Sequence, residues 1–171
     1  MNKYNLLIMF GLLALVLSGC AASKKEVKIA GDVKTVGNTV SVNGTSTLEA
    51  DSKIKIELKD IETDAVLEEA VAKVNKDHTY SASFKRDEKD EEHKLVVTFN
   101  PDEQPDAIQK IYGSSGENIR EGSPGLIKNR KDGEEYARIQ MFDFIYKVEK
   151  GSPRQSTFLL DYFDHPNSGG E

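Results

Sequence analysis

The sequence predicts an all-β protein, built mainly as an antiparallel sandwich. Apolar and charged residues alternate in several segments, most clearly from Lys53 to Lys59, and this period of two is typical of half-buried antiparallel strands. Turn-forming residues separate the segments at intervals of about 8–12 residues, as in many sandwiches. After the N-terminal segment about 150 residues remain, which is enough for one domain with a hydrophobic core.

The first predicted strands lie between residues 40 and 74. Val40-Ser41-Val42 alternates and is followed by Asn43-Gly44, a dipeptide that favours turns. The strand from Lys53 to Lys59 is followed by a predicted turn at Glu62-Thr63-Asp64. The segment from Val66 to Val74 also fits helical spacing, but its strand neighbours favour a strand.

Two more strands are predicted before residue 101. The polar turn Asn75-Lys76-Asp77-His78 precedes an alternating segment from Thr79 to Phe84. Arg86 to Glu92 is predicted to form a highly charged loop. The next strand contains the alternating residues Leu95, Val97 and Phe99.

The second half of the chain is less regular. Ala107 to Tyr112 fits a short helix or a short strand, and this choice stays open. Gly113 to Gly133 is rich in Gly, Ser, Asn and charge and is predicted to be a long loop; loops of this length are often functional. Tyr136 to Val148 and Thr157 to Phe163 return to strand character.

The N-terminus has the three parts of an export signal in order. Lys3 is basic, Leu6 to Leu17 is apolar, and Leu17-Ser18-Gly19-Cys20 ends the segment with small residues and a cysteine. The apolar run is shorter than the roughly 20 residues that cross a bilayer and fits a signal peptide. The four residues ending at Cys20 resemble the lipobox of bacterial lipoproteins.

This resemblance implies a specific modification and location. The signal would be cleaved before Cys20, whose thiol would carry a diacylglyceryl group, with an N-acyl chain as an open addition. Cys20 is the only cysteine, so the chain forms no internal disulfide. Ala21-Ala22-Ser23-Lys24-Lys25 is interpreted as a solvated tether. We therefore expect a membrane-anchored protein on the extracytoplasmic face.

The predicted organisation places one sandwich between this anchor and a loose tail. Val27 to Pro101 resembles an immunoglobulin-like or transthyretin-like module, but it lacks the cysteine pair and Trp of antibody domains. The predicted units are a cleaved signal peptide (1–19), the lipidated cysteine and tether (20–26), the sandwich core (27–101), the long loop with C-terminal strands completing or flanking the sandwich (102–163) and a flexible tail (164–171).

The sequence indicates no catalytic or metal-binding residues. His78, His93 and His165 do not share metal-ligand spacing and are interpreted as surface or structural residues. The acidic run from Asp87 to Glu92 could attract calcium, although a solvated hairpin tip is favoured. Gly113-Ser114-Ser115-Gly116 resembles a phosphate loop only in composition, because Glu117 stands where such a loop needs Lys.

Two further motifs have structural interpretations. Asn43-Gly44-Thr45 fits a glycosylation sequon but is interpreted as a hairpin turn. A set of aromatic residues is interpreted as core, with an exposed patch for a protein or glycan partner as the alternative. This set comprises Phe142, Phe144, Tyr146, Phe158, Tyr162 and Phe163.

The expected function is non-catalytic binding at a cell envelope, in which loops or a strand edge bind an envelope protein or a glycan. The net charge of -6 disfavours nucleic acid as a partner, because nucleic-acid sites are basic. Two alternatives stay open. One is an envelope enzyme or enzyme inhibitor with its site in the 113–133 loop, and the other is a carrier of a metal or small ligand. No cofactor is expected beyond the lipid on Cys20.

Overall fold

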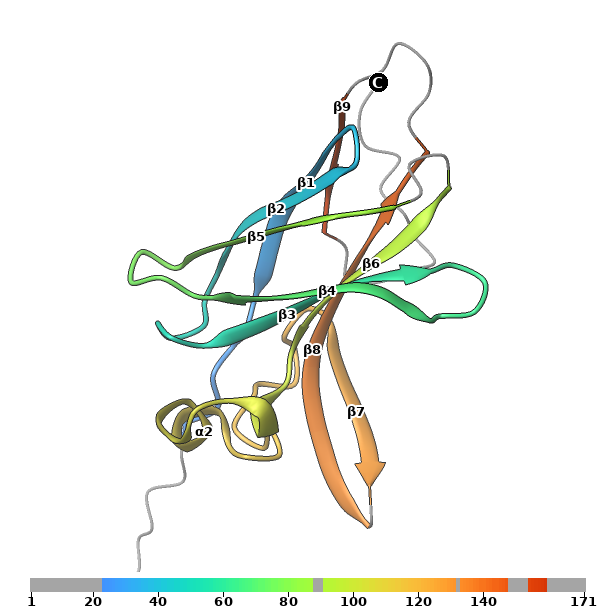
Figure 1. The fold of residues 1–171 in the computed structure, drawn as a ribbon. Coiled ribbons are helices and arrows are strands. Elements are labelled where there is room, and N and C mark those ends of the chain that lie inside the picture. Colours follow the sequence, from blue (N-terminus) through green and yellow to red (C-terminus); the bar gives the residue numbers. More distant parts are fainter. Residues whose placement is uncertain (1–22, 88–90, 132, 148–153, 160–171) are drawn as a thin grey trace, which may run out of the picture.

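The computed structural model is a sandwich of two antiparallel sheets packed face to face, as the sequence predicts (Figure 1). It describes residues 23–87, 91–131, 133–147 and 154–159. Within these residues, no helix is both long enough and apolar enough to cross a membrane. The resemblance of residues 27–101 to immunoglobulin-like or transthyretin-like modules stays a prediction.

The smaller sheet has four strands in the order β5-β2-β1-β9. Neighbouring strands all pair antiparallel, and the hairpin of the first two turns at Gly37, whose φ is 58°. A positive φ is unstrained for glycine. The strands are β1 (Ile29–Val36), β2 (Thr39–Ser46), β5 (Thr79–Lys85) and β9 (Arg154–Phe158).

The larger sheet has five strands in the order β4-β3-β6-β8-β7. The long strand β8 lies between β6 and β7, so residues after Pro101 complete this sheet, while β9 completes the other (Figure 1). The strands are β3 (Lys53–Asp60), β4 (Val66–Lys73), β6 (His93–Phe99), β7 (Leu126–Lys131) and β8 (Glu134–Ile145).

Two short helical segments connect β6 to the second half of the chain. They are the 3-10 helix η2 (Pro101–Glu103) and the helix α2 (Asp106–Tyr112). The helix settles the choice that the sequence left open for Ala107 to Tyr112. It lies over one end of the sandwich, where the ring of Tyr112 contacts that of Phe99 edge-on at 5.1 Å between centroids.

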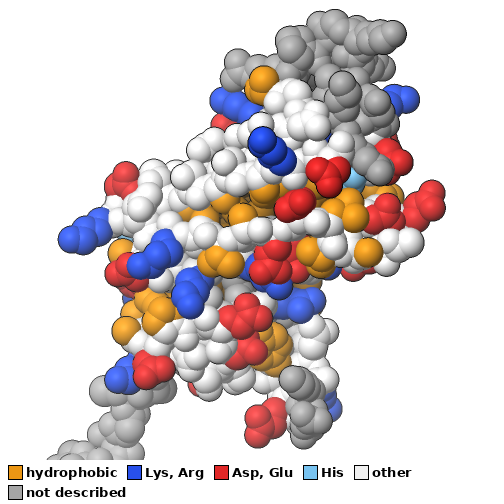
Figure 2. All heavy atoms as spheres, in the orientation of Figure 1, with side chains coloured by type: hydrophobic (Ala, Val, Ile, Leu, Met, Phe, Trp, Pro, Cys, Tyr) orange, Lys and Arg blue, Asp and Glu red, His pale blue; other side chains and the backbone are white. Residues whose placement is uncertain are grey.

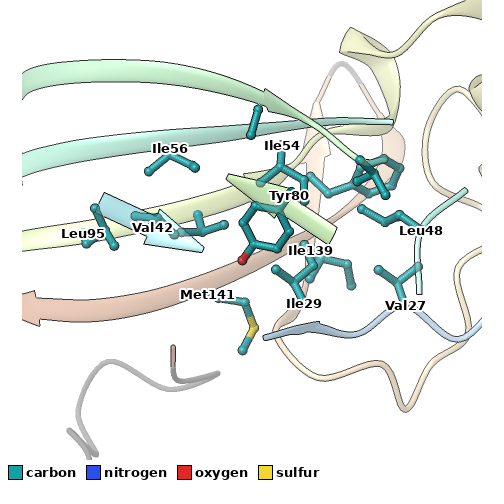
Figure 3. Close-up of a cluster of buried hydrophobic side chains, with 14 of the residues drawn as sticks. Val27, Ile29, Val42, Leu48, Ile54, Ile56, Tyr80, Leu95, Ile139 and Met141 are labelled. Atoms are coloured by element: carbon teal, nitrogen blue, oxygen red, sulfur yellow. The ribbon is translucent and has the colours of Figure 1, made fainter. Parts of the chain in front are cut away.

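The core fills the space between the sheets with the inward-facing residues of both. Figure 3 shows the side chains of Val42 and Tyr80 from one sheet beside Ile54, Ile56 and Leu95 from the other. All five are at most 1 % exposed. Burying a side chain of this size stabilises the fold by roughly 1.5–3 kcal/mol, so this layer fixes the register of every strand that contributes to it.

The prediction of a hairpin turn at Asn43-Gly44-Thr45 is wrong, because these residues lie inside β2. Gly44 faces the core opposite Gly31, and a Cβ atom on it would lie 2.2 Å from the Ala30 carbonyl oxygen and 2.6 Å from the Tyr80 ring. The glycine is therefore needed for the close approach of Tyr80 and not for a turn.

Two further predicted boundaries differ from the structure. The loop predicted from Gly113 to Gly133 is irregular only as far as Gly125, because Leu126 to Lys131 form β7. Arg86, assigned to the charged loop, is buried with 1 % exposure. Residues 88–90 of that loop lie outside the described residues.

Candidate functional site

Residues 25–27, called the fastened segment below, are held by hydrogen bonds to residues 118–123 at the end of the sandwich where α2 lies. Lys25 forms a parallel bridge with Ile119: its N–H donates to the Asn118 carbonyl at 2.7 Å, and its carbonyl accepts from the Arg120 N–H at 2.8 Å. Val27, which is fully buried, donates from its N–H to Ser123 Oγ at 3.0 Å. Residues 25–27 therefore belong to the folded domain, although the sequence assigned residues 25 and 26 to the tether.

The candidate lipidation site lies just before this fastened segment. Cys20 itself lies outside the described residues, and only five peptide units separate it from Lys25. An extended chain advances at most about 3.5 Å per residue, so the sulfur-bearing residue lies within roughly 17 Å of the bridge to Ile119. In Figure 1 the first described residues run beside α2, and the β7–β8 hairpin projects toward the same end.

A cavity of about 250 Å³ lies toward the opposite end of the sandwich, near the β3–β4 turn and the end of β5. Acidic and hydrophobic side chains lie side by side around the β3–β4 turn in Figure 2. The lining residues include two buried cationic or titratable groups, four carboxylates and two leucines: Arg86, His93, Asp60, Glu68, Asp87, Glu91, Leu58 and Leu67.

Arg86 joins three parts of the chain at this end. Its guanidinium Nη1 donates to the carbonyl oxygens of Tyr146 at 3.1 Å and Glu91 at 3.4 Å. Its backbone N–H donates to the Asn38 carbonyl in the β1–β2 turn at 2.9 Å. A guanidinium stays charged and offers five donors, so Arg86 can hold loops from both sheets together.

His93 and Asp143 add two more buried polar side chains to the inner face near this end. They are 2 % and 3 % exposed, and their strands β6 and β8 are paired. Asp60 pairs with His93 across β3 and β6. Hydrogen bonds from Thr63 hold the pKa of the Asp60 carboxyl below its usual value, and the charge of His93 acts in the same direction.

The polar lining residues of the cavity are four carboxylates, Arg86 and His93. None of its described lining residues is Ser, Thr, Cys, Lys or Tyr, the usual activated nucleophiles apart from carboxylates and His. Among the described residues there is also no group of three or more His, Cys, Asp and Glu that could hold a metal ion. The carboxylates can accept hydrogen bonds from a small polar group, and the N–H groups of Arg86 and His93 can donate them.

The other histidines do not join this site. His78 lies in the β4–β5 turn with a φ of 64°, and its Nδ1 is 3.1 Å from the Leu48 carbonyl oxygen. It therefore has a structural contact in an exposed turn. His165 lies outside the described residues.

The loop after α2 was the sequence-based candidate for a catalytic site. Ser115 Oγ donates to Glu117 Oε2 at 2.9 Å. Burial alone would raise the pKa of Glu117, but hydrogen bonds from its own backbone and from Ser115 lower it below the usual value. The Ser115 N–H also donates to Glu117 Oε2 at 3.1 Å, so this pair closes the turn.

Several other charged groups of this loop form ion pairs. Lys128 contacts Glu121 and, at 3.0 Å, Glu135. The hydrogen bond to Lys128 lowers the pKa of Glu121, and the pKa of Lys128 is raised. Both shifts favour the charged forms. These residues border a hollow of about 160 Å³ beside Lys24, at the fastened end of the domain.

The interpretation of the β8 aromatic residues as core is wrong. Phe142 and Phe144 are half-buried on the outer face of the larger sheet, and Tyr146 is 38 % exposed. Phe144 and Tyr146 stack with their centroids 5.9 Å apart. The inner face is taken by Ile139, Met141 and Ile145. The side chain of Phe158, and Tyr162 and Phe163 entirely, lie outside the described part of the chain.

Sequence reasoning also missed a surface on the smaller sheet. Its outer face on β2 and β5 carries hydroxyl and amide side chains in alternate positions and ends at Lys85, opposite Thr39. These residues are Thr39, Ser41, Asn43 and Thr45 on β2 and Thr79, Ser81 and Ser83 on β5. The signal in the sequence is the alternation of these polar residues with Val40, Val42, Tyr80 and Phe84.

No protein-family model matches the chain, and no curated protein or solved structure is significantly similar to it.

Proposed function

We propose that the chain is a lipid-anchored lipoprotein on the extracytoplasmic face of a cell membrane, where its sandwich binds a partner without catalysis. The observation that carries this proposal is the difference between the two ends of the domain. The segment after Cys20 is fastened at the α2 end through Lys25 and Val27, whereas the cavity bordered by Arg86 lies toward the other end.

The length of β1 sets the distance between these two ends. It runs from Ile29, just after the fastened segment, to Val36, beside the turn that contacts Arg86. Eight residues of antiparallel strand extend about 24 Å. A lipid on Cys20 would therefore hold the α2 end at the bilayer and present the cavity end and both sheet faces to the surroundings.

The first experiment tests the anchor. Cells expressing the full chain are fed an alkyne-tagged fatty acid, and the protein is examined for label and for its presence in membrane fractions. We expect both in the wild type, both to be lost in Cys20→Ser, and neither to be lost in the matched variant Ser23→Ala. A Cys20→Ser protein that stays as firmly membrane-bound as the wild type would contradict the proposal.

The second experiment tests the orientation. The chain contains no Trp, so one introduced Trp reports on a single place. Ser114, in the loop after α2 that holds residues 25–27, and Ile61, in the β3–β4 turn, are both exposed. In vesicles containing brominated lipids, we expect stronger quenching for Ser114→Trp than for Ile61→Trp. Equal quenching, or the reverse order, would show that the domain does not stand as proposed.

A further inference from the structure

Between Ser41–Thr45 on β2 and Thr79–Ser83 on β5, the outer face is an uncharged array of hydrogen-bonding groups, and Lys85 lies beyond its end opposite Thr39. The two strands are paired in register, so Ser41 lies opposite Ser83, Asn43 opposite Ser81 and Thr45 opposite Thr79. Asn43, Ser81 and Ser83 are exposed and Ser41 is half-buried. Alternate residues on one strand are about 6.8 Å apart, and opposite Cβ atoms are about 5 Å apart.

The polar groups at the centre of this array are not engaged within the domain. Among the described residues, the side chains of Ser41, Asn43, Ser81 and Ser83 make no hydrogen bond to protein, and only Thr79 does so, with Asn75 and Asp77. Their donors and acceptors are therefore directed to solvent or to a ligand.

Two charged residues on β1 border the array and are also available. Asp32 is paired with Asn43 and Lys34 with Ser41, and both are half-buried. They are two residues apart on one face, as are Lys55 and Glu57 on β3, which form an ion pair at 3.1 Å. No such pair joins Asp32 and Lys34 among the described residues. Together with Lys85 at the end of β5, these charges border the array and can strengthen hydrogen bonds to a neutral ligand.

We propose that this face, defined by Asp32, Lys34, Ser41, Asn43, Ser81 and Ser83, binds a neutral polyhydroxylated chain, that is, a glycan. The centres of protein–protein interfaces are enriched in aromatic residues and depleted in Ser. This face has the opposite composition, because it contains three serines and no aromatic residue. Nucleic acids and anionic membranes select basic patches. An uncharged ligand with many hydroxyl groups matches a flat array of donors and acceptors.

The affinity of such a face is expected to be low for one molecule. Each neutral hydrogen bond contributes little net free energy, because it replaces one to water. If the chain is displayed on a membrane as proposed above, many copies would engage one polymer and avidity would raise the binding. The glycan inference itself does not depend on the lipid anchor, because the face belongs to the folded domain.

The test uses the purified full chain in detergent micelles and two neutral probes, cellohexaose and chitohexaose, with polygalacturonate as a charged control. Binding is measured by titration of amide NMR signals. We expect saturable shifts at residues on β2 and β5 with at least one of the neutral probes, and no saturable shifts at Lys55 and Glu57 on the other sheet. Absence of binding to both neutral probes at millimolar concentration would overturn the proposal, as would a preference for polygalacturonate.

A double variant separates loss of the face from loss of folding. Asn43→Glu with Ser81→Lys places opposite charges directly across β2 and β5, a pairing that sheets accept. We expect unchanged thermal stability and at least tenfold weaker glycan binding. The matched control Val71→Lys adds a charge to the outer face of the other sheet, where Val71 is 57 % exposed, and should leave binding unchanged.

Two outcomes of the double variant would refute the assignment. Unchanged glycan binding would show that the ligand binds elsewhere on the chain. A concentration-dependent dimer in sedimentation that only the double variant abolishes would assign the face to a second copy of the chain. Neither outcome bears on Cys20, so failure here is distinct from failure of the proposed anchor.

Discussion

The outer faces of the two sheets meet solvent in different ways. On the larger sheet, Lys55 forms ion pairs with Glu57 at 3.1 Å and with Glu69 at 3.0 Å, and Lys94 lies over the Phe142 ring at 5.3 Å. On the smaller sheet, the outward-facing Ser41, Asn43, Ser81 and Ser83 of β2 and β5 carry hydroxyl and amide groups without hydrogen-bond partners in the described domain. Charged groups that satisfy one another leave little for a ligand, whereas unengaged neutral groups remain available. Paired charges already solvate the outer face of the larger sheet. Solvation alone therefore does not explain why the smaller sheet carries unengaged hydroxyl and amide groups.

The largest effect that sharpens this comparison lies beneath the polar face. Gly44 faces Tyr80 and Gly31, whereas the described strands of the larger sheet contain no glycine. We expect Gly44→Ala to reduce the free energy of unfolding by about 3 kcal/mol, because the new methyl group would overlap backbone atoms that cannot move aside. Urea denaturation measures this loss. Gly122→Ala, where a Cβ meets nothing within 4 Å, should be nearly neutral, and equal losses would contradict the argument.

The second prediction adds the same charge to each face. Glu57→Lys removes one of the two carboxylate partners of Lys55 and places a like charge beside it, while Glu69 remains opposite. We therefore expect a loss of about 1 kcal/mol in the free energy of unfolding. Ser81→Lys should change stability by less than about 0.5 kcal/mol, because no charged neighbour opposes it. Molar salt should reduce only the first loss. Two equal losses would show that the faces do not differ electrostatically.

The third prediction concerns the loss of stability at alkaline pH. Burial raises the pKa of Tyr80, and burial together with the hydrogen bond to Asp102 raises that of Tyr136. Because the folded pKa exceeds the unfolded one, the stabilisation is complete below the ordinary value of about 10 and is lost as the pH rises above it. Tyrosinate absorbance should show these residues ionising late, together with unfolding. Tyr136→Phe should reduce the alkaline loss of stability.

The smallest expected effect is on the loss of stability at acidic pH. The hydrogen bond from Lys94 lowers the pKa of Asp64, with Lys59 acting in the same direction. A lowered folded pKa gives stability that is present above the ordinary value near 3.9 and lost as the pH falls below it. Asp64→Asn should therefore lower stability slightly at neutral pH and flatten its acid dependence. A variant with an unchanged acid profile would show that this exposed ion pair contributes nothing.

The fold was predictable where alternation was one-sided. Lys53 to Lys59 has apolar residues on one face and charges on the other, so the strand and its inner face followed directly. In β8 both faces carry large apolar side chains, and the sequence could not show that Ile139 and Met141 face inward while Phe142 faces outward. Asn43-Gly44 was misjudged because local propensity favours a turn, whereas the contact of Gly44 with Tyr80, far along the chain, decides the outcome.

The candidate site was less predictable than the fold. Cys20 carries a local motif, so its predicted role needs no knowledge of the fold. Arg86 is buried through contacts with carbonyls of Glu91 and Tyr146, and the latter pairing spans sixty residues that no periodicity reveals. The polar face depends on the pairing of β2 with β5, which are separated in sequence by both β3 and β4. These polar residues therefore form one surface only because the sheet topology places β2 beside β5.

The fastened N-terminal segment also determines how the domain would respond to force. A pull on an anchor at Cys20 reaches the fold first at the single bridge between Lys25 and Ile119 and then along the axis of β1. Its eight paired positions with β2 have hydrogen bonds that lie across this direction. If a bound polymer holds β2 while the anchor pulls on β1, the two strands are sheared against each other. Their hydrogen bonds then share the force and must break together rather than one after another. The domain would then resist extraction from the surface most strongly when its outer face is occupied.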